Sequence, residues 1–461
     1  MIHRIHEMVW GPWLLVLFLG TGIFFTVKSG FFQIRKFPFW WKHTIGSIQE
    51  DEGEEKGEVT KFQTACTALA ATIGTGNIAG VATALTAGGP GAIFWMWVSA
   101  GIGMMTGYAE TMLGIRYRYR DRNGAWICGP MVYLERGLKL PGLGMLYSFL
   151  CIMVSLGMGS MVQSNSIAET LEFSFGIPPI PIGILLTGTV LLVVLGGIAR
   201  IAFVSERLIP ISAGAYMLFS MVVIMSCYDK IPYIFQCIFQ DAFRPVSVFS
   251  GAAGYQISKS LQYGVSRGVF SNEAGLGSMA VLHGAAEDTT PEQQGMWAMF
   301  EVFFDTILIC TMTAFVILCM TDGDAAGAGY DGAALTAFCF SKRLGLLGEY
   351  VVSGAMLIFA FATIIAWYYL GRQAAIYLAE SLKERRSLYI LQRILRGKVY
   401  TLLYLGAVFL GCLAKLETVW EFSDIWNGLM ALPNIIAIIF LMREVTVPGN
   451  EEKWELKCTR R

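Results

Sequence analysis

The chain has 461 residues, of which 55% are hydrophobic and 15% charged, and its mean hydropathy is +0.56. Soluble domains are about 45–50% apolar and about 25% charged, so this composition excludes an ordinary soluble domain and indicates a polytopic membrane protein. The formal net charge is zero, which gives no indication of a nucleic-acid partner. The ten cysteines are scattered, mostly in apolar runs, so we predict neither a disulfide framework nor a cysteine metal site.

Apolar runs long enough to cross a bilayer, roughly 17–25 residues each, recur along the whole chain. We expect about eleven membrane-spanning segments, near residues 10–27, 63–87, 91–115, 145–171, 179–197, 206–227, 255–282, 295–320, 346–371, 399–414 and 424–442. The first run lacks a clear cleavage site, so we expect a retained helix rather than a signal peptide. The stretch 46–61 is expected to be a solvated loop, and 228–254 to lie at the membrane interface.

The basic residues predict an orientation, because cytoplasmic loops of membrane proteins hold the excess of Lys and Arg. With the N-terminus outside, 26 of the 34 Lys and Arg residues fall in inner loops and the C-terminal tail, and 7 fall in outer segments. We therefore expect a multi-pass protein of the cell (inner or plasma) membrane, surrounded by the lipid bilayer, with its N-terminus outside and its C-terminus in the cytoplasm.

The second apolar run carries a Gly-Thr-Gly-Asn sequence at residues 74–77, near its middle. At membrane depth an unwound backbone persists only where protein or a water-filled cavity covers it. Such a break places helix ends and free carbonyl groups at mid-membrane, where they can hold ions and zwitterions. This break is the strongest indication in the sequence of a binding site.

A second interrupted run lies at residues 261–280, five spans after the first. Its glycine and polar residues are Gly268, Ser271, Asn272, Glu273, Gly275 and Gly277. An offset of five spans inverts the second copy in the membrane, and paired breaks at corresponding positions are typical of a transporter binding site. The alternative is that small residues only allow neighbouring helices to pack closely.

The residues at both breaks also resemble a known family. The sequences Gly-Thr-Gly-Asn-Ile-Ala-Gly-Val-Ala at 74–82, Gly-Gly-Pro-Gly-Ala-Ile-Phe-Trp-Met-Trp at 88–97 and Arg-Gly-Val-Phe-Ser-Asn-Glu-Ala-Gly-Leu-Gly-Ser at 267–278 look like signatures of the alanine or glycine:cation symporter (sodium:alanine symporter) family. Further matches are Gln163 with Asn165, Gly-Gly-Ile-Ala-Arg-Ile-Ala at 196–202 and Thr-Ile-Ile-Ala-Trp at 363–367. The resemblance extends from about residue 10 to 445.

This resemblance implies uptake of a small neutral amino acid, alanine- or glycine-like, coupled to sodium, or in some members to protons. The implied fold is all-α and LeuT-like, a five-plus-five inverted repeat with one extra N-terminal helix. The expected division is 1–62 for the extra helix and a cytoplasmic loop, 63–227 for the first repeat, 228–254 for an interfacial connection, 255–443 for the second repeat, and 444–461 for a cytoplasmic tail.

The implied substrate is a small zwitterion, and the two breaks offer groups for both of its charges. Backbone N–H groups of Gly74, Thr75, Gly76 and Asn77 are expected to bind the carboxylate. Carbonyl groups of Phe270, Ser271 and Asn272 are expected to bind the ammonium group, and Gln163 to add an amide contact. Trp367 is expected to close the side-chain pocket, with ordinary helix packing as the alternative.

Sodium is a hard cation that suits oxygen ligands. By resemblance to LeuT-like transporters, one sodium site would join carbonyl groups of Ala70, Ile73 and Phe359 to the hydroxyl of Thr363, which would also border the substrate. The chain departs from its relatives nearby. Ala362 stands where relatives usually have Ser, and Ala366, Tyr368, Leu370 and Arg372 stand where they tend to have Gly, Ser, Tyr and Glu. These departures leave the cation and the amino acid open.

Charged residues within spans are costly and usually functional. They are Glu110, Glu169, Arg267, Glu273, Glu301 and Asp305. We expect Arg267 and Glu273 to pair across the second break, as a gate or a strut. Glu301 and Asp305 are four residues apart, hence on one helix face, serving either proton coupling or a polar face toward the bundle.

An enzyme is not expected, because the four histidines (His3, His6, His43 and His283) lie near ends or in loops without metal-ligand spacing. A channel is harder to separate by pattern alone, since non-helical backbone also lines pores. A proton-coupled transporter of a different small amino acid and a non-transporting amino-acid sensor remain alternatives. No obligate protein partner is evident.

Overall fold

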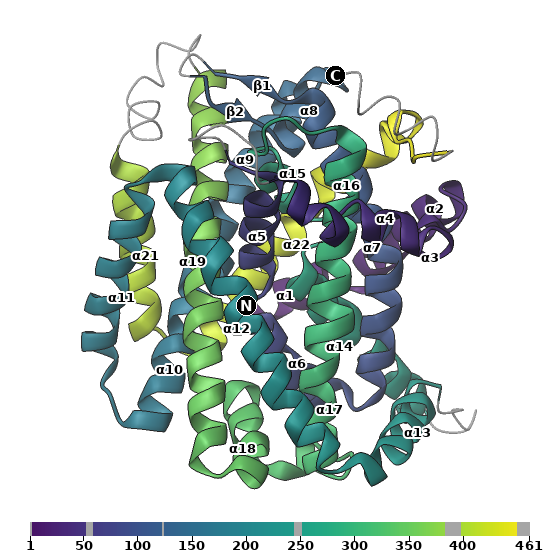
Figure 1. The fold of residues 1–461 in the computed structure, drawn as a ribbon, viewed down its shortest axis with the longest axis vertical. Helices are drawn as coiled ribbons and strands as arrows, with labels where there is room; N and C mark the ends of the chain where they lie inside the picture. Colours follow the sequence, from purple (N-terminus) through teal and green to yellow (C-terminus); the bar gives the residue numbers. More distant parts are fainter. Residues whose placement is uncertain (1, 52–58, 122–123, 244–250, 383–397, 450–461) are drawn as a thin grey trace.

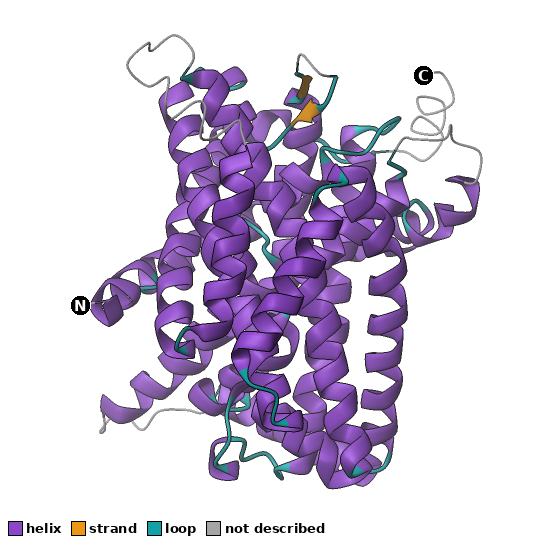
Figure 2. Ribbon diagram, turned by 90° about the vertical axis from the view of Figure 1, so that its left-hand side faces the viewer, coloured by secondary structure: helices purple, strands orange, loops and turns teal. Residues whose placement is uncertain are grey.

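The computed structural model describes residues 2–51, 59–121, 124–243, 251–382 and 398–449, and these residues are almost entirely helical (Figure 2). Within them, strands occur as one hairpin, β1 (Tyr119–Arg120) and β2 (Trp126–Ile127), in which Tyr119 pairs with Ile127. The N-terminal elements are α1 (Ile2–Val9), α2 (Pro12–Lys28), α3 (Phe32–Arg35), α4 (Phe37–Lys42) and η1 (Ile45–Asp51).

The next helices are α5 (Lys61–Thr72), η2 (Gly76–Gly80), α6 (Val81–Gly88), α7 (Gly91–Tyr117), α8 (Pro130–Arg136), α9 (Pro141–Leu156), η3 (Gly157–Val162), α10 (Gln163–Phe175), α11 (Pro179–Val194) and α12 (Gly197–Met225). The connection contains η4 (Tyr228–Lys230) and α13 (Ile231–Ala242). The remaining helices are α14 (Gly251–Asn272), α15 (Ser278–His283), α16 (Pro291–Val302), η5 (Phe303–Cys310), α17 (Thr311–Met320), η6 (Ala326–Ala328), α18 (Gly332–Leu344), α19 (Leu346–Ser381), α21 (Lys398–Leu413), α22 (Leu416–Phe440) and η8 (Met442–Glu444).

Several described helices are long and apolar enough to cross a membrane. Five continuous stretches qualify: Pro141–Phe175, Gly197–Met225, Pro291–Met320, Leu346–Ser381 and Val419–Phe440. A sixth arises if Lys61–Thr72 and Gly76–Gly88, which meet at a 49° bend, form one span. Shorter apolar helices are Pro12–Lys28, Pro179–Val194 and Val399–Leu413. The count of eleven spans stays a prediction.

The outward faces of the peripheral helices are apolar. Leu185 on α11, Ile211 on α12 and Leu402 on α21 expose 71%, 73% and 66% of their surface. In water such a surface would favour association, whereas lipid chains cover it at no cost to backbone hydrogen bonds, which these helices satisfy internally. The chain is therefore a membrane protein with a lipid-facing belt around a buried polar interior.

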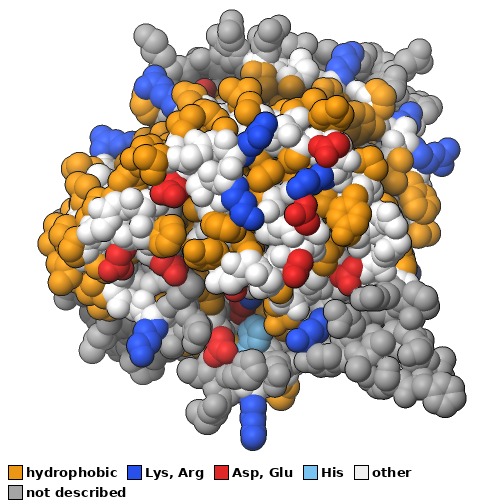
Figure 3. All heavy atoms as spheres, turned by 90° about the horizontal axis from the view of Figure 1, so that it is seen from below, with side chains coloured by type: hydrophobic (Ala, Val, Ile, Leu, Met, Phe, Trp, Pro, Cys, Tyr) orange, Lys and Arg blue, Asp and Glu red, His pale blue; other side chains and the backbone are white. Residues whose placement is uncertain are grey.

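The two ends of the bundle differ in content. The β1–β2 hairpin and α8 lie at one end and α13 and α18 at the other (Figure 1). In the hairpin, the guanidinium groups of Arg118 and Arg120 lie 4.0 and 4.5 Å from the ring centre of Trp126. At the opposite end, acidic and basic side chains are scattered over the central area, and hydrophobic side chains are more frequent toward the edge (Figure 3). The hairpin end is the one predicted to be cytoplasmic, and that orientation stays a prediction.

Local sequence signals explain where key helices begin. Thr60 and Gln63 form a capping box at the start of α5, with the Gln63 N–H donating to Thr60 Oγ1 at 3.1 Å. Proline occupies the first turn of α2, α9, α11 and α16, where its missing N–H costs nothing. Gln63 Nε2 also donates to Glu206 Oε2 at 2.9 Å, which ties α5 to α12.

The predicted interfacial connection 228–254 contains α13, while residues 244–250 lie outside the described part of the chain. Parts of the predicted 46–61 loop (52–58), of the basic loop after the ninth span (383–397) and of the tail (450–461) lie outside it too. The division of the chain into two repeats stays a prediction.

Candidate functional site

The first break lies between α5 and the π-helical turn η2. Ile73 is extended (φ −75°, ψ 90°), so the chain leaves the helix directly after Thr72. The Gly74 N–H donates to Asn77 Oδ1 at 2.9 Å, and the Thr75 N–H donates to Gln163 Oε1 at 3.2 Å. Two of the donors predicted for a substrate carboxylate are therefore bonded to side-chain oxygens in this conformation. The Thr75 hydroxyl is buried and has no hydrogen-bond partner among the described residues.

Glycine is needed at this break for space. A Cβ on Gly74 would lie 2.7 Å from Thr363 Oγ1 and 3.1 Å from Gln163 Oε1. A Cβ on Gly76 would lie 3.2 Å from Ser271 Cα. The first distance is shorter than normal carbon–oxygen contacts allow. The missing side chains thus let the backbone of the first break approach α19, α10 and the last turn of α14.

The second break lies between α14 and α15, at residues 273–277. Glu273, Gly275 and Gly277 have positive φ values of 57°, 94° and 83°, a region that glycine tolerates and glutamate rarely adopts. The last carbonyl groups of α14, including those of Phe270 to Asn272, have no further helical turn to bond. Gly268, which the sequence placed at the break, lies inside α14, where a Cβ would be 2.7 Å from Ser99 Oγ.

Helices α7 and α22 hold this second break in shape. Glu110 Oε2 accepts hydrogen bonds from the Gly277 N–H at 3.1 Å and from Asn434 Nδ2 at 2.7 Å. Asn434 Nδ2 also donates to the Gly275 carbonyl at 2.8 Å, and the Tyr133 hydroxyl donates to Asn434 Oδ1. The intramembrane Glu110 therefore caps the start of α15, where a negative charge is favourable.

One carboxylate joins the two breaks. Asp305, in η5, accepts from Asn77 Nδ2 at 2.6 Å and from the hydroxyls of Ser271 and Thr306, both at 2.8 Å. Asn272 Nδ2 donates to Thr306 Oγ1 at 3.0 Å. The sequence singled out Asp305 as an intramembrane charge that serves either proton coupling or a polar face toward the bundle, and did not place it in the binding site. Its position one span after the second break was the available signal.

The predicted sodium ligands converge on one hydroxyl. Thr363 Oγ1 lies 2.9 Å from the Ala70 carbonyl, 3.4 Å from that of Ile73 and 3.0 Å from that of Phe359. A hydroxyl has one hydrogen to donate, so three carbonyl oxygens surround a group that can satisfy one of them. An all-oxygen cluster suits a hard cation. The neighbouring Ala362 is fully buried and adds no oxygen.

Trp367 lies against the second break. Its Nε1 donates to Glu273 Oε1 at 2.9 Å, and a Cβ on Gly159 would lie 2.5 Å from Trp367 Cβ. Gly159 belongs to η3, and the Tyr404 hydroxyl lies 3.1 Å from its carbonyl and 2.7 Å from that of Ile364. The indole of Trp367 is therefore held between the π-helical turn η3 and the second break. Π-helical turns are frequent at functional sites, and the three here (η2, η3 and η5) all border the two breaks.

Among the residues that depart from the family pattern, Tyr368 packs against α21. The Tyr368 ring packs against those of Tyr400 and Tyr404, with centroids 5.7 and 5.4 Å apart, and its hydroxyl lies 2.8 Å from Thr401 Oγ1. These partners belong to α21. The remaining departures are buried at Ala366 and Leu370 and half-buried at Arg372. Tyr368 thus adds bulk between α19 and α21.

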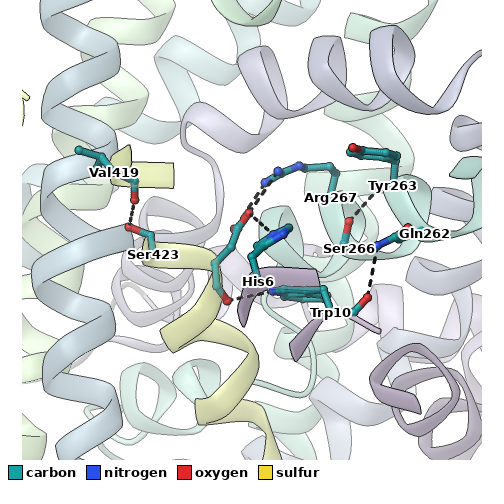
Figure 4. A network of polar contacts seen from close by, with 9 residues as sticks. His6, Trp10, Gln262, Tyr263, Ser266, Arg267, Val419 and Ser423 are labelled. Carbon is teal, nitrogen blue, oxygen red and sulfur yellow. Dashed lines mark hydrogen bonds and ion pairs between the residues drawn. The ribbon is translucent and has the colours of Figure 1, made fainter. Parts of the chain in front are cut away.

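The predicted pairing of Arg267 with Glu273 is wrong. Arg267 binds Asp424 of α22 instead, with Nη2 3.2 Å from Oδ2 (Figure 4). His6 Nε2 lies 3.3 Å from the same oxygen, and Trp10 Nε1 donates to the Asp424 carbonyl at 2.9 Å. Because α14 ends at Asn272, Glu273 leaves the helical path of Arg267, and its carboxylate turns to Trp367.

The other intramembrane charges differ in their surroundings. Glu301 and Asp305 are both buried, as a polar face toward the bundle requires. Glu301 Oε2 lies 3.1 Å from Nε2 of His283, a residue that the sequence placed among those near ends or loops and that is in fact fully buried. Glu169, by contrast, is exposed on α10.

The sequence is similar to those of known membrane transporters. A sequence model described as the sodium:alanine symporter family matches residues 1–452. A sodium/alanine symporter AgcS from Methanococcus maripaludis is 39% identical over 448 residues, covering 96% of this chain and 94% of the relative. An uncharacterized transporter from Haemophilus influenzae is 41% identical over 447 residues, covering 96% and 94%. A probable sodium/glutamine symporter GlnT from Bacillus subtilis is 34% identical, covering 95% and 87%.

A solved structure gives the same arrangement of helices. A Na+-coupled sialic acid symporter in a substrate-bound outward-open state matches with a TM-score of 0.55 and 15% sequence identity, covering 95% of this chain and 86% of that one. At this identity the likeness concerns the fold alone. It confirms the LeuT-like, all-helical transporter architecture predicted from the sequence.

Proposed function

Because this chain belongs to the sodium:alanine symporter family, a family of membrane transporters and not of enzymes, we propose that it imports a small neutral amino acid together with sodium by alternating access. The observation that carries the proposal is the convergence of three backbone carbonyls and the Thr363 hydroxyl beside the first break. These four neutral oxygen atoms suit a cation site that needs no charged side chains.

The cation would be held by Thr363 Oγ1 and the carbonyl oxygens of Ala70, Ile73 and Phe359. The bound cation would replace the hydroxyl hydrogen of Thr363 as the partner of the three carbonyl oxygens. These ligands come from α5, the first break and α19, so cation binding would fix α19 against the first break. A cation at this position would bind the conformation in which α19 lies against the first break better than other conformations. Its binding would therefore favour that conformation.

The amino acid would lie between the two breaks. Its carboxylate would take the place of Gln163 Oε1 at the Thr75 N–H, and its ammonium group would face the last carbonyls of α14 and the Asp305 carboxylate. Trp367 and its neighbour Gly159 would limit the side chain to a small one. The named substrates of relatives include both alanine and glutamine, so the size of the pocket is the property to test. We further propose that the hairpin end faces the cytoplasm.

The test is uptake of labelled alanine, glycine, serine and glutamine by proteoliposomes holding the full chain, with an imposed sodium or proton gradient. We expect sodium-driven uptake of the small amino acids. Thr363→Val should raise the half-saturating sodium concentration, while Thr363→Ser retains sodium dependence. Thr67→Val is the matched control, because the buried Thr67 hydroxyl bonds only the Gln63 carbonyl of its own helix. Wild-type uptake that does not depend on the sodium gradient would refute sodium coupling.

A further inference from the structure

A histidine and a glutamate form a buried pair beyond the second break. His283 is the last residue of α15, Glu301 lies on α16, and the two side chains expose 0% and 2% of their surface. His283 Nε2 is 3.1 Å from Glu301 Oε2, and Nδ1 is 2.6 Å from Gln294 Oε1. Nothing in the proposed sodium or amino-acid site uses this pair.

The orientation of the Gln294 amide determines how many protons the pair holds. Gln294 Nε2 donates to Thr289 Oγ1 at 3.0 Å, which turns the amide oxygen toward His283. An amide oxygen only accepts, so Nδ1 carries a hydrogen. A neutral imidazole then has a bare Nε2, and its contact with the Glu301 carboxylate needs one more proton between them. With that proton the pair has zero net charge, the favourable state for a buried group.

The surroundings of the pair favour the proton. Three carboxyl groups lie close enough to Glu301 to be affected by a charge on it: Glu110 of α7, Glu273 of the second break and Asp305 of η5. From α5, Thr72 approaches, but its hydroxyl donates within its own helix, and Glu301 Oε1 has no hydrogen-bond partner in the described part of the chain. An unprotonated pair would therefore place an added negative charge among other acidic groups.

Basic and other titratable groups lie at the hairpin end of α15. Arg118 donates to the carbonyls of Gly284 and Ala286, and Cys128 Sγ donates to the Ala280 carbonyl. Tyr369 of α19 lies near Arg118 and Cys128. The Arg118 contacts lie directly beyond the end of α15 and the Cys128 contact lies within it, so these groups surround the end of the helix that carries His283.

We propose that His283 and Glu301 form a proton-binding site, loaded in this conformation and emptied when α15 separates from α16. Separation exposes both groups to water, which accepts the proton and leaves a hydrated carboxylate and a neutral imidazole. Since α15 continues from the second break, movement of the binding site and release of this proton are linked. The proton is thus a second coupled cation, in addition to the proposed sodium ion.

The first test does not depend on transport. In a full-length variant with His3, His6 and His43 replaced by Gln, His283 is the one remaining imidazole. Nitrogen NMR of the ¹⁵N-labelled ring should show a protonated Nδ1 at every pH and loss of the Nε2–Glu301 proton in one step, with that step absent in Glu301→Gln. An unprotonated Nδ1 would overturn the proposal, because Nε2–H could then serve the carboxylate without an additional proton.

The second test follows protons during transport. Proteoliposomes loaded with a pH-sensitive dye receive a sodium gradient and alanine. We expect lumenal acidification in step with uptake in the wild type and in Glu287→Gln, whose carboxylate pairs with the surface residue Arg120 at 2.9 Å, and a loss of acidification in Glu301→Gln and His283→Gln. Unchanged acidification per alanine in both variants would overturn the proposal. An absence of sodium-driven uptake of alanine, glycine and serine in the wild type refutes the proposed function, while the NMR measurement still decides the proton site.

Discussion

Replacing Gly74 by alanine tests the geometry of the first break directly. The new Cβ would lie 2.7 Å from Thr363 Oγ1 and 3.1 Å from Gln163 Oε1, so one or both side chains must move by several tenths of an ångström. Overpacking of this kind costs about 1–3 kcal/mol. Gly74 does not have a positive φ, so the backbone itself tolerates alanine and the cost is steric. Reduced entropy of the unfolded chain offsets only about 0.4–1 kcal/mol.

The strain falls on Thr363, a proposed sodium ligand. If it is expressed there, about 1–3 kcal/mol corresponds to a rise of roughly 5- to 150-fold in the half-saturating sodium concentration. The assay is sodium-dependent alanine uptake, with thermal unfolding measured on the same preparations. Gly80→Ala is the matched control, since Gly80 lies in the adjacent π-helical turn with no atom within 4 Å of the new Cβ. Equal sodium dependence in both variants would refute the placement of Gly74 against the cation site.

Two other variants test the neighbouring contacts. Gly159→Ala places a Cβ 2.5 Å from Trp367 Cβ, so we expect a several-fold loss of amino-acid affinity with sodium dependence retained, measured by competition in the uptake assay; an unchanged affinity would remove Trp367 from the pocket. Asp424→Asn removes the charge that binds Arg267, and leaving a charge partly buried without its partner costs about 3–5 kcal/mol. We expect a lower unfolding temperature, restored in part by adding Arg267→Gln; equal stability of all three proteins would show that the ion pair contributes nothing.

The positions of the breaks could be predicted because they depend on residue type. Gly74, Gly76, Gly275 and Gly277 interrupt apolar runs, and the structure ends its helices beside them. The family resemblance predicted the four sodium ligands. The oxygen atoms that surround Thr363 are compatible with that prediction, and the role of the cluster stays a prediction.

The polar pairs between distant spans could not be predicted from the sequence. Arg267 was matched with the nearby Glu273, but its partner Asp424 lies 157 residues away on α22. His283 precedes a polar stretch, which in the sequence is typical of a loop, whereas the structure buries it completely at the end of α15. Which acid meets which base depends on the register of packed helices, and a single sequence carries no direct record of that register.

The 49° bend between α5 and α6 gives the two halves of one span different neighbours. The half before the bend packs mainly on α12, α19, α15 and α16, and the half after it packs mainly on α14, α7, α18 and α17. Because the bend lies between these two sets of helices, any shift of one set relative to the other would change the geometry of the first break itself.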